Sequence, residues 1–78
     1  MKIDWPDIFK NGAYIAKDDD GGINAFTKKP KVIKIYAMWI SNGEFSALEP
    51  DIFDLSFLPQ EWWDLPWQES LIQKPEGE

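Results

Sequence analysis

The chain has 78 residues with 8 basic and 14 acidic side chains, a net charge of −6, and neither cysteine nor histidine. The length allows one small domain, and the missing residue types exclude the usual zinc, iron–sulfur and haem sites and the Ser-His-Asp and Cys-His nucleophilic devices. All eight basic residues are lysines, so no arginine can recognise phosphate or guanine in a bidentate way.

Residues 1–12 are predicted to enter the fold through one helical turn. Asp4 lies near its start, and Pro6 falls in its first turn, where proline is tolerated. Trp5, Ile8 and Phe9 then share one apolar face. The segment is expected to close one end of the core.

Two short runs, 13–17 and 23–27, have the composition of strands. Between them lies DDDGG at residues 18–22, and aspartate and glycine both favour turns. The pattern predicts a β-hairpin.

The run 32–40 is rich in β-branched and aromatic residues and is predicted to be one continuous strand. Asn42-Gly43 follows, a strong signal for a two-residue turn with both residues at positive φ. Residues 44–48 would then return beside 32–40, with Ile40 opposite Phe45. Both faces of this sheet are largely apolar, so both require a cover.

The C-terminal third contains Pro50, Pro59, Pro66 and Pro75, and this spacing leaves no room for a long helix. Short helical turns are predicted at 51–56, 60–65 and 67–72, folding back over the sheet. The predicted class is therefore α+β or mostly β: an antiparallel sheet of about four strands with short C-terminal helical turns packed on one face. Residues 1–78 form one domain, and 73–78 are a predicted frayed tail.

Two candidate chemical sites are weak. An EF-hand loop with Gly21 at its sixth position would run from Ala16 to Thr27, and neither end supplies a carboxylate. Residues 18–22 are therefore interpreted as a plain turn, with no metal and no cofactor.

Paired carboxylates near tryptophan are the remaining candidates for acid–base catalysis, but so short a chain offers little material for a substrate cleft. We predict that the protein is not an enzyme. The carboxylates considered are Glu61, Asp64 and Glu69.

Three tryptophans fall within residues 62–67. Such rings either fill a core or anchor an interface, because tryptophan is enriched at interaction hot spots. We expect Trp63 and Trp67 to be buried and Trp62 to be the exposed candidate.

The acidity belongs to the C-terminal part of the chain. Residues 35–78 carry one lysine and nine acidic residues, a net charge of −8, whereas residues 1–34 carry seven lysines and five acidic residues. This predicts a protein partner with a basic surface and disfavours direct contact with nucleic acid, whose phosphates would be repelled. The alternative is that the charge serves only solubility. The predicted partner-binding residues are Glu49, Asp51, Asp54, Glu61, Trp62, Asp64 and Glu69.

No apolar run approaches the about 20 residues that span a bilayer, and the N-terminus has no apolar signal core. The prediction is a cytoplasmic protein without a membrane partner, monomeric or a small homo-oligomer.

Several sequence pieces resemble small accessory proteins of phages and prophages. They are Asp4-Trp5-Pro6, the run 12–16 leading into Asp20-Gly21, Lys29-Pro30, and the closing pattern Trp67-x-x-Ser70-Leu71-x-x-Lys74-Pro75. The resemblance implies a non-structural role in the cytoplasm of an infected host.

The resemblance, the acidic half and the missing catalytic residue types together suggest a phage-encoded inhibitor. It would bind a host complex that handles nucleic acid or defends against phage, such as a CRISPR effector or a restriction enzyme, through an acidic surface that imitates DNA. The alternative is an assembly module that self-associates through an exposed sheet edge.

Overall fold

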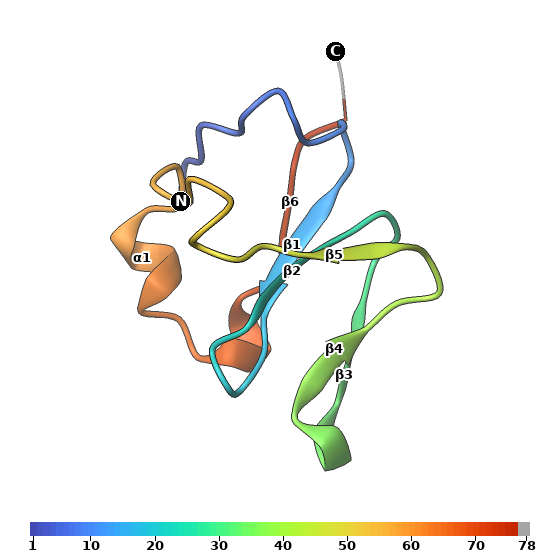
Figure 1. Cartoon of the computed structure of the whole chain (residues 1–78). Helices are drawn as coiled ribbons and strands as arrows, with labels where there is room; N and C mark the ends of the chain where they lie inside the picture. The colour runs from blue at the N-terminus through green and yellow to red at the C-terminus, as the bar shows by residue number, and fades with distance from the viewer. Residues whose placement is uncertain (77–78) are drawn as a thin grey trace.

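A computed structural model, which describes residues 1–76, contains two antiparallel sheets connected by short turns (Figure 1). The strands are β1 (Tyr14–Lys17), β2 (Ile23–Phe26), β3 (Lys31–Ile33), β4 (Met38–Ile40), β5 (Phe45–Ala47) and β6 (Ile72–Gln73). The helical segments are η1 (Lys34–Tyr36), α1 (Gln60–Trp63) and η2 (Trp67–Glu69). The larger sheet has the order β5-β2-β1-β6, and β3 pairs with β4. The predicted fold class is confirmed.

The predicted first hairpin is also confirmed. β1 and β2 pair with Tyr14 opposite Phe26 and Lys17 opposite Ile23. In the turn, the backbone N–H of Asp18 donates to the carbonyl of Gly22 at 2.8 Å. Glycine is favoured at position 21, because its φ of 87° lies in the left-handed region, which other residues rarely adopt.

Apolar side chains cover both faces of the larger sheet, because successive strand residues point to opposite sides. On one face, the residues 1–12 and the segment from Leu48 to Leu65 enclose the larger cluster. On the other face, the β3–β4 hairpin, η2 and Leu71 enclose the smaller cluster. The larger cluster contains Ile15, Ile23, Leu48, Leu55, Leu58 and Trp62, and the smaller contains Ala16, Phe26 and Trp39. The C-terminal turns therefore contribute to both faces rather than to one.

The prediction of a continuous strand over 32–40 is wrong. The run bends through η1 and reverses at Ala37, whose φ of 51° is left-handed, so that Val32 comes to pair with Trp39. Folding the run back on itself lets Trp39 bury its ring beside Phe26. That gain in burial outweighs the strand preference of the run, which is a weak and context-dependent quantity.

The predicted hairpin at Asn42-Gly43 is wrong as well. β5 pairs with β2, with Phe45 opposite Phe26, and residues 41–44 cross from the smaller sheet to the larger one. Neither Asn42 nor Gly43 has a positive φ. Gly43 is instead required by packing, because a Cβ there would overlap the side chains of Thr27 and Lys28.

The tryptophan assignment is corrected. Trp62 is fully buried and donates its indole N–H to the carbonyl of Ser70 at 2.7 Å, whereas Trp63 is 39% exposed. Trp67, which was expected to be buried, is only partly buried against the smaller cluster. The Lys17 ammonium lies 5.0 Å from the Trp62 ring centroid and donates to the Trp63 carbonyl at 2.6 Å. The charged end of β1 thus holds the C-terminal end of α1.

Both ends of the chain differ in part from expectation. Trp5 and Phe9 pack on the larger cluster as predicted, but Ile8 is exposed. Gln73 pairs with Tyr14, and the Lys74 ammonium donates to the Phe9 carbonyl at 2.7 Å, so these two residues are not frayed. Residues 77–78 of the predicted tail lie outside the described residues. None of the helices described within 1–76 is long and apolar enough to cross a bilayer.

Candidate binding edge at strand β5

Strand β5 lies at the edge of the larger sheet, and its pairing with β2 determines which backbone groups point outward. The N–H of Thr27 donates to the carbonyl of Glu44 at 3.0 Å, and the N–H of Leu48 donates to that of Ile23 at 2.8 Å. Directly bonded pairs alternate along an antiparallel ladder. The bonded residue of β5 between these two pairs is therefore Ser46.

The residues on either side of Ser46 consequently direct their N–H and C=O groups away from β2. They are Phe45 and Ala47, and no other strand within residues 1–76 pairs with this side of β5. All three residues of β5 are exposed, and Phe45 is 68% exposed. A row of unpaired strand groups beside exposed apolar side chains is a template for pairing with another chain.

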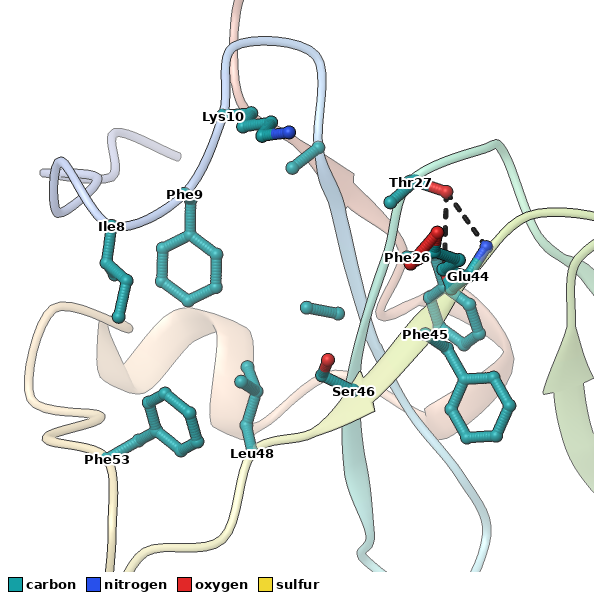
Figure 2. A pocket seen from close by; sticks show the side chains of 12 residues that line it. Ile8, Phe9, Lys10, Phe26, Thr27, Glu44, Phe45, Ser46, Leu48 and Phe53 are labelled. Atoms are coloured by element: carbon teal, nitrogen blue, oxygen red, sulfur yellow. Dashed lines mark hydrogen bonds between the residues drawn. The ribbon is translucent and has the colours of Figure 1, made fainter.

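An apolar hollow of about 320 Å³ lies on the face of β5 that carries Ser46. Figure 2 shows Phe9, Phe53 and Leu48 around it, with Phe45 beyond the strand. The N-terminal turn supplies Phe9, and the segment after β5 supplies Phe53, so two distant parts of the chain complete the hollow.

A second hollow of about 240 Å³ lies on the opposite face, between the larger sheet and the β3–β4 hairpin. Phe26 and Phe45, whose ring centroids are 6.3 Å apart, line it together with Met38 and Ile40. Phe45 also lines the first hollow. The outward edge of β5 is thus flanked by apolar space on both faces, which matches the alternating side chains of an extended peptide.

Exposed carboxylates stand at both ends of this edge. Glu44 precedes β5, and its backbone N–H donates to the Thr27 hydroxyl at 3.0 Å, which holds this end of the strand. Glu49 follows Leu48 at the other end. An extended ligand with basic residues at its ends would complement these charges.

The six predicted acidic residues are all exposed, but they are spread over several elements. Glu49 is next to the β5 edge, Asp51 and Asp54 lie in the following segment, Glu61 and Asp64 lie on and just after α1, and Glu69 lies on η2. The buried Trp62 is not available at the surface, so its predicted role as an exposed partner-binding residue is wrong.

Two of the carboxyl groups have shifted pKa values. Hydrogen bonds from the side chain and backbone of Ser56 lower the pKa of Asp54, whose Oδ1 accepts the Ser56 N–H at 3.0 Å. Burial raises the pKa of Asp18, which accepts hydrogen bonds from Trp39 and Asn24 and so joins the two sheets. Within residues 1–76, no group of three or more acidic side chains is placed to hold a metal ion.

The sequence analysis missed Phe45 and Ala47 because it assigned their strand the wrong neighbour. The available signal was the exposed run of 45–47 without a charged residue, which is ambiguous until the pairing is known. No family model matches the chain, and neither the curated proteins nor the solved structures yield a match.

Proposed function

We propose that this protein is a non-catalytic protein-binding module that takes up an extended segment of a partner as an added strand beside β5. The observation that carries the proposal is the unpaired outer edge at Phe45 and Ala47, flanked by an apolar hollow on each face. In strand addition, main-chain hydrogen bonds supply affinity, and pockets for alternate side chains supply specificity.

The charges around the edge favour a partner other than a second copy. An antiparallel pairing of two copies that uses both outward residues is centred on Ser46. Glu44 then lies opposite Leu48 of the second copy and beside its Glu49, at both ends of the pair. Glu44 and Glu49 point to opposite faces and so do not lie directly across from each other, but each end of such a pair brings together two carboxylates of like charge. A segment with an apolar centre and a lysine or arginine near each end avoids this repulsion.

The phage-inhibitor hypothesis gives this module a biological setting. The exposed acids from Glu49 to Glu69 would attract a host protein with a basic surface, and the β5 edge would then hold one of its extended segments. Long-range charge mainly raises the association rate, whereas buried contacts mainly set the dissociation rate. The two features would therefore act in succession on one partner.

Selection from a displayed library of random seven-residue peptides tests the proposal. Enriched peptides should alternate apolar and other residues and carry basic ends. Ala47→Pro removes an outward N–H without removing a bond to β2, and it should weaken the peptides at least about tenfold, or 1.4 kcal/mol. Equal binding to wild type and to Ala47→Pro would overturn strand addition at β5.

A matched pair of substitutions controls for general loss of apolar surface. Phe45 and Ile52 are similarly exposed, at 68% and 72%, but only Phe45 lies on the edge. Phe45→Ser should weaken the selected peptides, while Ile52→Ser should leave their affinity unchanged. Thermal melting of each variant verifies that the fold is retained.

A further inference from the structure

The hollow of about 240 Å³ between the larger sheet and the β3–β4 hairpin is apolar along most of its length and polar at one end. We call it the inter-sheet hollow. Met38, Ile40 and Phe45 line it while remaining exposed. Asp18 and Asn24 supply the polar end. Apolar walls with a small number of placed polar groups are typical of a site that recognises one kind of ligand group.

The Asp18 carboxylate is held in place at this end. Its Oδ1 accepts the Trp39 N–H at 2.9 Å, and its Oδ2 accepts the side-chain amide of Asn24 at 3.4 Å. The N–H and C=O of a strand residue point the same way, so the Trp39 carbonyl is also directed to this side of β4. No backbone N–H within residues 1–76 donates to that carbonyl. The polar end therefore offers hydrogen-bond acceptors with one negative charge.

The charge of Asp18 has no lysine beside it among residues 1–76. Lys17 is its neighbour in sequence, but the Lys17 ammonium donates to the carbonyls of Trp62 and Trp63 at 3.2 and 2.6 Å. Burial raises the pKa of Asp18, and repulsion by Asp20 raises it further, while no lysine contributes a shift in the other direction. A cation at this end would lower that pKa and find no competing positive charge.

The opposite end of the inter-sheet hollow is different in charge. There the Ser41 hydroxyl donates to the carbonyl of Lys28 at 2.9 Å, and Ile40 pairs with Lys31. Both lysines are exposed. Because the two ends differ in sign, a cationic group entering the hollow is attracted to the Asp18 end alone.

A strand added beside β5 would send side chains into this hollow. Phe45 and Ala47 lie opposite Phe26 and Asn24 of β2, and opposite residues place their side chains on the same face. Guest residues paired with Phe45 and Ala47 therefore also face the hollow. Adjacent strands are 4.7–4.9 Å apart, so β2 would lie roughly 10 Å from the guest strand. A long side chain is needed to reach the Asp18 carboxylate, which is bonded to Asn24 above β2.

We infer that the inter-sheet hollow is a specificity pocket for a lysine or arginine of the added segment, whose aliphatic stem lies along Phe45 and whose charged end bonds to Asp18. The inference rests on the proposed strand addition at β5. Long basic side chains bury their stems on apolar surface while the charged end keeps polar partners, and aromatic faces attract the cation. The partner segment would then place apolar side chains in the hollow of about 320 Å³ and basic ones in the inter-sheet hollow.

Two synthetic seven-residue peptides, acetylated and amidated at their ends, test the pocket. One is Lys-Val-Lys-Leu-Lys-Val-Lys, and the other has norleucine at the two inner lysines, which keeps the stem and removes the ammonium. With the leucine opposite Ser46, the inner positions lie opposite Phe45 and Ala47 in either strand direction. In isothermal titration calorimetry at neutral pH, the lysine peptide should bind at least about tenfold more tightly. Equal affinities, or no binding of the lysine peptide, would overturn the inference.

A matched pair of substitutions assigns this preference to one carboxylate. Asp18→Asn keeps an acceptor for Trp39 and should remove most of the preference for the lysine peptide. Asp19→Asn makes the same change in charge one residue further along, at a position that does not line the inter-sheet hollow, and should keep the preference. An undiminished preference in Asp18→Asn, or an equal loss in both variants, would contradict the pocket.

A measurement on the wild type complements the variants. Carbon-13 NMR of the Asp18 carboxyl group over a range of pH should show its pKa lowered by the lysine peptide and not by the norleucine peptide, because a neighbouring cation favours the charged form. The same pKa in both complexes would overturn the inference.

Ala47→Pro separates failure of the pocket from failure of strand addition. If the two peptides bind the wild type equally and Ala47→Pro weakens both, strand addition at β5 stands and the lysine pocket is wrong. If Ala47→Pro leaves the binding of both peptides unchanged, strand addition itself is wrong, and the pocket fails with it.

Discussion

The carboxylate of Asp18 accepts a hydrogen bond of 2.9 Å from the backbone N–H of Trp39, and this bond connects the β1–β2 turn to strand β4. β4 pairs with β3 on its other side, so Asp18 satisfies a backbone group that no strand within residues 1–76 reaches. The β1–β2 turn, which the sequence predicted as a plain turn, therefore also positions the β3–β4 hairpin and the hollow of about 240 Å³ beside it.

Two substitutions of Asp18 should differ in their effect on stability. Asp18→Ala removes the acceptor and leaves a partly buried N–H unpaired, which should lower the free energy of unfolding by about 1–3 kcal/mol. Asp18→Asn keeps an acceptor oxygen and removes the charge, so it should retain most of the stability. Urea denaturation at neutral pH measures both, and equal losses in the two variants would contradict the role of the acceptor.

The pKa of Asp18 adds a pH dependence. Burial raises this pKa, repulsion by Asp20 raises it further, and the hydrogen bond from Trp39 opposes both. Because the folded state then binds the proton more tightly than the unfolded state, the contribution of Asp18 to stability falls as pH rises from 3.8 through the raised pKa. The stability of Asp18→Asn relative to wild type should therefore increase over this window. A difference that is constant with pH would contradict the raised pKa.

Trp62 and Trp63 should differ strongly in a matched pair of substitutions. Trp62→Phe opens space in the larger cluster and leaves the Ser70 carbonyl without its 2.7 Å donor, which should cost about 2–4 kcal/mol. Trp63 is partly exposed, and its indole N–H makes a 3.2 Å bond to the Leu58 carbonyl, so Trp63→Phe should cost about 1 kcal/mol. Thermal melting of both variants provides the comparison.

Two glycines should be sensitive for different reasons. At Gly43, an added Cβ would overlap the side chains of Thr27 and Lys28, so Gly43→Ala should destabilise by about 1–3 kcal/mol through overpacking. At Gly21, nothing obstructs a Cβ, and only the φ of 87° resists substitution, so Gly21→Ala should cost about 1 kcal/mol. If Gly43→Ala melts as the wild type does, the close approach of residues 27, 28 and 43 is incorrect.

The exposed acidic residues between 51 and 64 should affect the association rate of a partner more than its dissociation rate. Replacing four exposed acids with their amides should slow association with a peptide selected on β5 and change its dissociation rate little. The effect should shrink as salt rises. Surface plasmon resonance at low and high salt measures both rates, and association that is independent of salt would contradict electrostatic attraction. The four residues are Asp51, Asp54, Glu61 and Asp64.

Local sequence patterns were sufficient for the elements whose partners are close in the chain. The alternation in 13–17 and 23–27, with aspartate and glycine between them, specifies the first hairpin, because both the turn and the pairing are short-range. The prolines of the C-terminal third likewise limit helices to single turns such as α1 and η2. The small α+β class follows from these signals, but the membership of the four-stranded sheet does not, because β5 was assigned another neighbour and β6 lies where a helical turn and a tail were predicted.

The tertiary structure alone decided which segments meet across the core. Residues 32–40 break at Ala37, which lets Trp39 bury its ring between the sheets, and β5 pairs with β2 rather than with β4. Trp62 and Trp63 are neighbours of identical chemistry, and only the position of α1 against the sheet buries one and exposes the other. The open edge of β5 is likewise absent from any local pattern, because a strand becomes an edge only when the whole sheet is assembled.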